Sequence, residues 1–145
     1  GTFNANPVSA AAGITALKII DSTDACEKAN ASGAWLRARF NEILEAEDVP
    51  WAAYGSFSGL HLFMNPGGMD ITPSTFKPDE VDYATLKAKR SDLVMKLRLA
   101  VAINGVDFNN SPGGQASAMH TPEDLELTAD AFQEALQMLK RDGEL

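Results

Sequence analysis

The apolar and polar positions along the chain predict four helices, and the first begins at a clear signal. Asn6 is a good helix cap, and Pro7 suits the first helical position, where its missing N–H costs nothing. Residues 10–13 are three alanines and a glycine, which give this helix a thin face. Because small side chains let another backbone approach closely, we expect this helix to pack tightly against something large.

A second helix is predicted from about Asp24 to the segment before Pro50. Asp24 and Glu27 have the spacing of a capping box, and Pro50 prevents the helix from continuing while it biases Val49 toward extended geometry. Apolar residues recur at helical spacing and predict one buried stripe. Its members are Gly33, Leu36, Phe40, Ile43 and Leu44.

The pattern then changes to the shorter period of strands. Two strands are predicted, at Trp51–Tyr54 and Gly59–Met64, with glycines around them. In the second strand, His61 and Phe63 alternate with the apolar residues at 60, 62 and 64, so they point to the opposite face. Residues 69–82, which contain two prolines, are predicted to be an excursion loop.

A third helix is predicted from about Tyr83 to Ile103, and Asn104-Gly105 suits its end. Short strands are predicted at 106–108 and 116–120, with residues 109–115 as a loop between them. The apolar residues expected to point inward from the helix are Leu86, Leu93, Leu97 and Val101.

The last helix has the clearest start in the chain. Thr121 is the expected cap, Pro122 occupies the first turn, and Asp124 is placed to return a carboxylate to the cap N–H. Gly143 is expected to end it. The predicted buried stripe is Leu125, Ala129, Phe132, Leu136 and Leu139.

This order of elements predicts an α+β domain. Its sheet is expected to be small, mostly antiparallel and covered by helices on one side. The first helix lies outside that pattern, and we interpret it as a connector.

Composition and charge narrow the class of protein. The 145 residues suit one domain, and 45% apolar content is ordinary for a globular protein without a membrane span or a secretory signal. A net charge of −8 argues against nucleic-acid binding, since the longest basic cluster is Lys87, Lys89 and Arg90. Cys26 is alone, so no intrachain disulfide is possible, and we expect a cytoplasmic protein.

The candidate chemical residues favour structural roles. His61 and His120 are far apart in sequence, with no carboxylate at ligand spacing, so we expect structural histidines and no metal site. Asp79, Glu80 and Asp82 could form an acid–base group, but acidic residues are also favourable where a loop enters a helix.

Two other motifs also fail to indicate a catalytic site. The Gly-rich turns at 65–68 and 111–114 lack the Lys-Ser/Thr of a phosphate-binding loop. Ser56 and Ser58 do not have the Gly-x-Ser-x-Gly frame of a nucleophile elbow. No catalytic residue is predicted in this chain.

Three segments nevertheless resemble a known family. The opening "GTFNANPVSAAAGITAL" resembles the start of the C-terminal part of class III pyridoxal-phosphate (PLP)-dependent aminotransferases, in the glutamate-1-semialdehyde aminomutase branch. The closing "SAMHTPEDLELTADAFQEAL" is similar to that family's last strand and helix, with a Ser-x-x-His-Thr-x-Glu-Asp pattern. "YGSFSGLHLFM" falls where the family has a Gly-Ser pair before an apolar strand.

The resemblance implies part of an α/β PLP-transferase of fold type I. Residues 1–22 would be a linking helix and cofactor-phosphate turn, and 23–145 the C-terminal small domain. Gly1 and Thr2 would contact the PLP phosphate of the partner subunit in a homodimer, and the substrates would be small amino donors and acceptors. The lysine that bonds to PLP would lie upstream, since no lysine here has the family setting: Lys18, Lys28, Lys77, Lys87, Lys89, Lys96 and Lys140.

Two departures leave the substrate open. Residues 108–121 replace the family's usual Ala-Pro-Ser-Gln-Phe-Glu stretch and are shorter, and neither Arg98 nor Arg141 falls on a terminal strand, where a carboxylate could be held. Aminomutase (an isomerase) and transaminase therefore both stay open. An alternative is a stand-alone, non-catalytic binding or assembly module that kept the fold.

Overall fold

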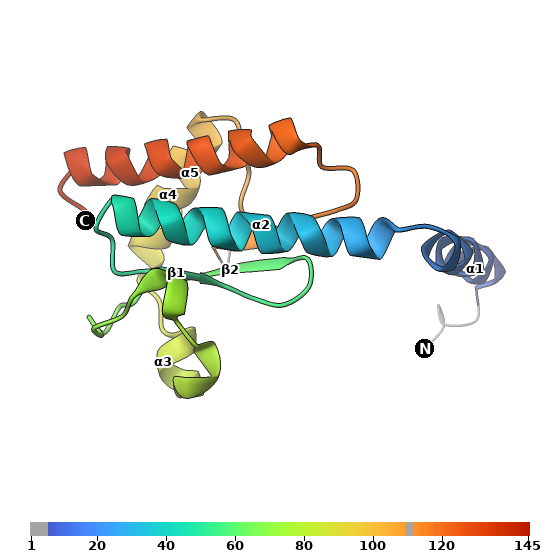
Figure 1. Cartoon of the computed structure of the whole chain (residues 1–145), viewed down its shortest axis with the longest axis horizontal. Helices are drawn as coiled ribbons and strands as arrows, with labels where there is room; N and C mark the ends of the chain where they lie inside the picture. Colours follow the sequence, from blue (N-terminus) through green and yellow to red (C-terminus); the bar gives the residue numbers. More distant parts are fainter. Residues whose placement is uncertain (1–5, 110–111) are drawn as a thin grey trace.

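The structure, a computed structural model, describes residues 6–109 and 112–145. A three-stranded antiparallel sheet carries helices on one face, and one further helix extends away from this body (Figure 1). The predicted α+β class is confirmed. No helix in the described residues combines the length and apolar character needed to cross a bilayer. The regular elements are α1 (Pro7–Ser22), α2 (Ala25–Ala46), β1 (Ala52–Tyr54), β2 (Gly59–Phe63), α3 (Tyr83–Lys87), α4 (Ser91–Ile103), β3 (Gly113–Gln115) and α5 (Pro122–Arg141), with single turns of 3-10 helix at Pro73–Thr75 and Pro78–Glu80.

Strand β2 lies in the centre of the sheet, and each of its neighbours runs antiparallel to it. The outer edge of β1 is occupied by a side chain from α2. The Asn41 amide donates to the Ala53 carbonyl (3.0 Å) and accepts from the Ala53 N–H (2.7 Å). Asn41 thus takes the hydrogen bonds that another strand would make, which protects this edge from pairing with other chains.

The turn between β1 and β2 is pressed against α2. A Cβ on Gly33 of α2 would lie 2.7 Å from the Phe57 carbonyl oxygen and from Ser58 Cα, so helix and turn are in backbone contact there. One turn further along α2, the Arg37 guanidinium donates to the carbonyls of Phe57 (2.9 Å) and Gly59 (2.5 Å). These contacts fix the "GSFSG" segment on the helix.

The core lies between the sheet and the helices. The stripe predicted for α2 is buried in full, as are four of the five positions predicted for α5, with Leu125 half-buried. At its centre the rings of Phe40 and Phe132 stack with centroids 4.1 Å apart. The other face of the sheet has its own cover, because Phe63 stacks on Phe76 from the excursion loop at 5.0 Å.

Helix α1 begins as predicted, since the Asn6 side chain accepts from the N–H groups of Val8 (2.9 Å) and Ser9 (3.4 Å). The expectation that it packs against something large is not met within the described chain, because none of its residues is buried.

The predicted single helix over 83–103 is wrong. The chain is extended at Ala88 and Arg90, which separates α3 from α4. Leu86 of α3 lines a small pocket with Tyr54 and Phe63, on the sheet face opposite α2, α4 and α5. Helix α4, in contrast, packs against α5. No glycine or proline lies at the break, and the helices on its two sides lie against different parts of the body. The predicted end of α4 is confirmed, with Gly105 in the left-handed region (φ +91°).

The predicted strands at 106–108 and 116–120 are also wrong. The third strand is instead Gly113–Gln115, inside the predicted loop. Gly113 has φ +127°, and a Cβ there would lie 2.1 Å from the Leu60 carbonyl oxygen, so only glycine approaches β2 this closely. Residues 117–120 form a turn, in which the His120 N–H donates to the Ser117 carbonyl (3.3 Å).

The predicted capping box at the start of α2 does not form. Asp24 is the N-cap residue, but its side chain makes no capping hydrogen bond and pairs with Lys28 (3.1 Å) instead.

Candidate functional site

A groove of about 460 Å³ lies beside the edge strand β3. Segment 106–109, strand β3 and the beginning of α5 surround it. Its lining combines apolar side chains with polar ones, which is typical of sites for small molecules. The apolar part comprises Leu36, Leu60, Val106, Phe108 and Leu125, and the polar part includes Asp107, Asn109, Gln115, His120 and Thr128.

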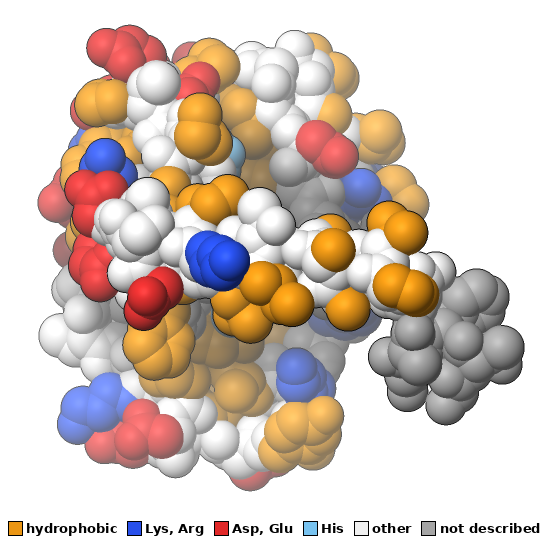
Figure 2. All heavy atoms as spheres, turned by 90° about the vertical axis from the view of Figure 1, so that its right-hand side faces the viewer, with side chains coloured by type: hydrophobic (Ala, Val, Ile, Leu, Met, Phe, Trp, Pro, Cys, Tyr) orange, Lys and Arg blue, Asp and Glu red, His pale blue; other side chains and the backbone are white. Residues whose placement is uncertain are grey.

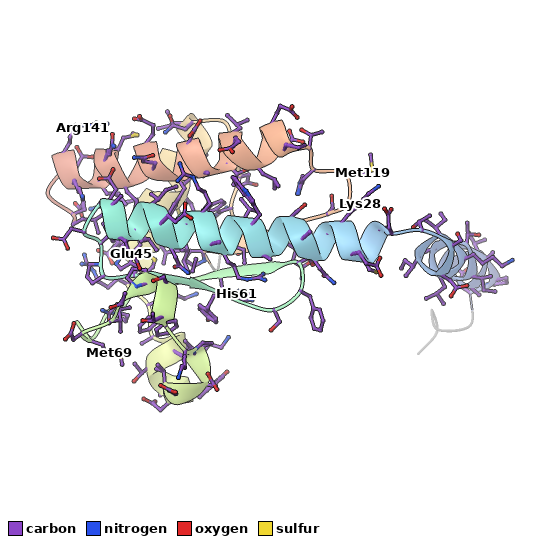
Figure 3. All side chains as sticks on the ribbon, viewed as in Figure 1. Lys28, Glu45, His61, Met69, Met119 and Arg141 are labelled. Carbon is purple, nitrogen blue, oxygen red and sulfur yellow. The ribbon has the colours of Figure 1, made fainter. Side chains whose placement is uncertain are left out.

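Both histidines of the chain are among the residues that line the groove, His61 on β2 (Figure 3) and His120 before α5, although they are far apart in the sequence. The ring of His61 lies against that of Tyr54, with centroids 5.4 Å apart. The Ser117 N–H donates to His120 Nδ1 (3.1 Å), so the neutral ring carries its proton on Nε2. Within residues 6–109 and 112–145, no three His, Cys, Asp or Glu side chains gather as a metal site.

The Ser-x-x-His-Thr-x-Glu-Asp motif forms a hydrogen-bonded helix start. The Met119 N–H donates to Ser117 Oγ (3.2 Å), and Thr121 and Asp124 form the predicted capping box, with distances of 3.2 and 2.8 Å. The hydrogen bond from the Thr121 N–H lowers the pKa of the Asp124 carboxyl. The Ser, His, Thr and Asp of this motif therefore have a structural role, since they position one wall of the groove.

Arg98 reaches the rim of the groove from the middle of α4. Its Nε donates to the Phe108 carbonyl (2.8 Å), and its guanidinium lies 3.6 Å from the Asp107 carboxylate. The sequence could not place this arginine, because the turn at Asn104-Gly105 folds segment 106–109 back along α4. Arg141 is exposed at the end of α5.

The three acidic residues near α3 do not come together as an acid–base group. Glu80 pairs with Lys77 (2.8 Å), and Asp82 caps α3 by accepting from the Thr85 N–H (3.0 Å). The hydrogen bond with Thr85 lowers the pKa of Asp82. Asp79 is exposed. These contacts agree with the structural interpretation.

The remaining candidates are placed as follows. Ser56 and Ser58 lie in the β1–β2 turn, where their carbonyls accept from the N–H groups of Gly59 and Ala116 (2.9 Å each). Gly1 and Thr2, the predicted contacts to a cofactor phosphate, lie outside the described residues.

The lysines all lie on the surface. Lys140 is half-buried and the other six are exposed. Four are paired with carboxylates, and Lys87 lies over the ring of Tyr83, 5.8 Å from its centroid. The paired ones are Lys28 with Asp24, Lys77 with Glu80, Lys96 with Glu144, and Lys140 with Glu47.

No family model matches the chain, but individual proteins do. It is 30% identical to glutamate-1-semialdehyde 2,1-aminomutase of Methanosarcina acetivorans over 94% of its own length and 30% of that protein. The corresponding values for the aminomutase of Methanopyrus kandleri are 28%, 96% and 30%. The chain thus spans under a third of the length of these relatives.

The comparison with solved structures also finds PLP-dependent transaminases that this chain matches over part of their length. An omega-transaminase from Sphaerobacter thermophilus superposes with a TM-score of 0.75 at 27% identity, over 94% of this chain and 29% of that one. The FumI protein of Sphingopyxis sp. MTA144, in its PLP internal aldimine form, has a TM-score of 0.66 at 23% identity over 92% and 27%, and shows the fold alone. The chain is therefore related to the glutamate-1-semialdehyde 2,1-aminomutases and has the fold of one part of a class III PLP-dependent aminotransferase.

Proposed function

We propose that this chain is the C-terminal part of a PLP-dependent aminotransferase or aminomutase that moves amino groups on amino-acid or semialdehyde substrates. In this proposal residues 23–145 are the small domain, and residues 1–22 link it to the rest of the enzyme. The observation that carries it is the similarity to aminomutases over 94% of the chain, together with the superposition on a transaminase.

We further propose that the chain does not provide the lysine that bonds to PLP. An enzyme of this class holds PLP through a lysine and pairs the pyridine nitrogen with a carboxylate. A lysine attacks a carbonyl only after it loses its proton, which burial or a nearby cation promotes. The lysines here lie on the surface and four of them are paired with a carboxylate, so none has the buried setting that such a lysine needs. The described residues therefore do not fit PLP by themselves.

The groove beside β3 is the part of the chain best suited to face a small substrate. Polar side chains line it, and Arg98 supports segment 106–109 from behind through the Phe108 carbonyl. The capping box and the Ser117–His120 turn hold the opposite wall. In this proposal the small domain shapes the substrate's surroundings, while the rest of the enzyme provides the covalent chemistry.

Covalent labelling tests the lysine assignment. The purified chain is mixed with one equivalent of PLP, reduced with borohydride and mapped by mass spectrometry. We expect sparse labelling spread over several surface lysines, as in a control protein with exposed lysines. Near-stoichiometric labelling of one lysine would contradict the assignment.

A stand-alone binding module remains the second candidate, because residues 24–145 enclose a complete core of their own. The coding sequence upstream of Gly1 separates the two. A large PLP-binding domain encoded in frame supports the aminotransferase, whereas a start codon immediately before Gly1 favours the module.

A further inference from the structure

The dipeptide Asn104-Gly105, where α4 ends, is the asparagine sequence of this chain that deamidates most readily. In deamidation, the backbone nitrogen of the following residue attacks the side-chain amide carbon, which is one reason why asparagine is thermolabile in proteins. Glycine has no Cβ, so its backbone nitrogen approaches that carbon with the least hindrance. Among the asparagines of the chain, Asn104 alone is followed by glycine.

The reaction needs water and no other reagent. The Gly105 nitrogen loses its proton and bonds to Cγ of Asn104, and the side-chain nitrogen takes up that proton and leaves as ammonia. The product is a five-membered succinimide ring. Water then adds to one of the two ring carbonyls and breaks its bond to nitrogen. The result is either aspartate or isoaspartate, in which the main chain runs through the former side chain.

The folded backbone holds the attacking nitrogen away from the side chain. Asn104 has ψ 14°, so the Gly105 nitrogen nearly eclipses the nitrogen of Asn104 itself, whereas the ring requires it to lie beside Cβ. The rotation would break a Schellman motif. In this motif the Gly105 N–H donates to the Ala102 carbonyl (3.0 Å). The Val106 N–H donates to the Val101 carbonyl (3.3 Å).

The side-chain amide of Asn104 is also held in place. Its nitrogen donates to the Ala100 carbonyl (2.9 Å) and to Met138 Sδ (3.6 Å) on α5, which packs against α4. The ring can form only after the amide leaves both acceptors. The reaction therefore requires a local opening in which the end of α4 unwinds and separates from α5.

Deamidation would weaken this contact permanently. A carboxylate has no N–H to donate, so the Ala100 carbonyl and Met138 Sδ would both lose their donor. The new negative charge would lie at the C-terminal end of α4, where the helix dipole is already negative. Isoaspartate would also lengthen the main chain inside the Schellman motif. The modified chain thus holds α4 against α5 less well than the original one.

We propose that Asn104 is a deamidation site that folding protects and local unfolding exposes, and that its modification destabilises the contact between α4 and α5. The inference depends neither on the proposed enzymatic function nor on what covers the exposed apolar side chains of α1, which Figure 2 shows where that helix projects from the body.

Peptide mapping by mass spectrometry tests the protection on the full chain. The chain is incubated at mildly alkaline pH, either folded in buffer or unfolded in guanidinium chloride, and the conversion at each asparagine is followed. We expect Asn104 to react at least about tenfold faster in the unfolded chain, because the folded chain reacts only through its open fraction. In guanidinium chloride, Asn104 should also react faster than the other asparagines.

A pair of methionine variants tests the contact with α5. Met138→Leu removes the sulfur acceptor and keeps a similar volume, so it should speed the reaction of the folded chain at least about twofold and leave the unfolded rate unchanged. Met95→Leu, at a position on α4 that is 53% exposed, is the matched control and should change neither rate. An unchanged folded-state rate in Met138→Leu would contradict the role assigned to α5.

The variant Asn104→Asp tests the consequence of the reaction. It should lower the thermal unfolding midpoint, whereas Asn30→Asp, which adds the same charge at another half-buried position, on α2, should lower it less. Equal reaction rates in the folded and unfolded chains would overturn the proposal. So would a reaction in guanidinium chloride that is slower at Asn104 than at the other asparagines, or an Asn104→Asp chain as stable as the wild type.

Discussion

Helices α1 and α5 both begin with a capping side chain followed by proline, Asn6-Pro7 in one and Thr121-Pro122 in the other. Helix α5 then buries six residues along one face and presents charged residues on the other. Helix α1 buries none. The same local signal thus begins a helix that completes the core and a helix that projects from it.

The difference between these helices lies in how their polar residues are distributed. In α5, charged side chains occupy one side and leave a defined apolar stripe, which fits between α2 and α4. In α1, two charges in 16 residues leave apolar side chains over most of the circumference. A cap therefore fixes where a helix starts, while the asymmetry of the following residues indicates whether it packs within its own domain.

The largest expected effect comes from the centre of the core. Phe132 of α5 is fully buried and stacks on Phe40, so Phe132→Ala should lower the free energy of unfolding by about 3–5 kcal/mol. Leu17→Ala in α1 should change it by less than about 0.5 kcal/mol, since Leu17 is 66% exposed. Urea unfolding at micromolar concentration, followed by tryptophan fluorescence, measures both. Equal losses would show that α1 packs on the body.

Two helical glycines give the next contrast. In Gly33→Ala the new Cβ would collide with the backbone of Phe57 and Ser58, so we expect a loss of about 1–3 kcal/mol. A Cβ added at Gly13 would have no neighbouring atom within 4 Å. Gly13→Ala should therefore favour helix in α1 by up to about 1 kcal/mol.

Thermal unfolding measures the first glycine variant and far-UV circular dichroism the second. A stabilising Gly33→Ala would mean that the β1–β2 turn yields easily. That result would weaken the view that α2 fixes this turn by backbone contact.

Structural features that depend on neighbouring residues could be predicted from the sequence, whereas features that depend on distant contacts could not. The buried stripe of α2 and the capping box of α5 were predicted correctly, because periodicity and capping involve neighbouring residues. The break before α4 was missed, since residues 88–90 contain no glycine or proline and the helices on either side of it lie against different parts of the body.

The candidate site was less predictable for the same reason. Strand β3 depends on the contact of Gly113 with Leu60, and the groove beside it is lined by residues as far apart in the sequence as Leu36 and Thr128. Arg98 contacts the groove wall because the turn at Asn104-Gly105 brings segment 106–109 beside it, and no local pattern in the sequence indicates that contact. The predicted cofactor contacts at Gly1 and Thr2 rest on the family resemblance.

Acid titration should measure how much the Glu47 carboxylate stabilises the packing of α5 in the body. Gln137, Lys140 and Gln133 of α5 all donate to the Glu47 carboxylate, which holds the pKa of Glu47 at about 2 instead of 4.5. The stabilisation is complete above pH 4.5 and is lost as the pH falls from 4.5 toward 2, where the folded protein also becomes protonated. With allowance for partial exposure it amounts to about 1–2 kcal/mol.

The measurement is urea unfolding of the wild-type chain and Glu47→Gln at about pH 6 and about pH 3. The difference in stability between them should narrow at the lower pH. A difference that stays constant would show that the Glu47 charge does not contribute, and that α5 is held by packing alone.

The smallest expected effect compares the two caps directly. Thr121→Ala removes the acceptor for the Asp124 N–H, and should lower the free energy of unfolding by about 1 kcal/mol, because α5 and the core unfold together. Asn6→Ala removes the equivalent acceptor from α1, but should leave the unfolding midpoint of the body unchanged and reduce only the helix signal of α1, which buries no residue. The two caps make equivalent hydrogen bonds to backbone N–H groups. A shift of the body's unfolding midpoint in both variants would therefore mean that α1 is coupled to the core.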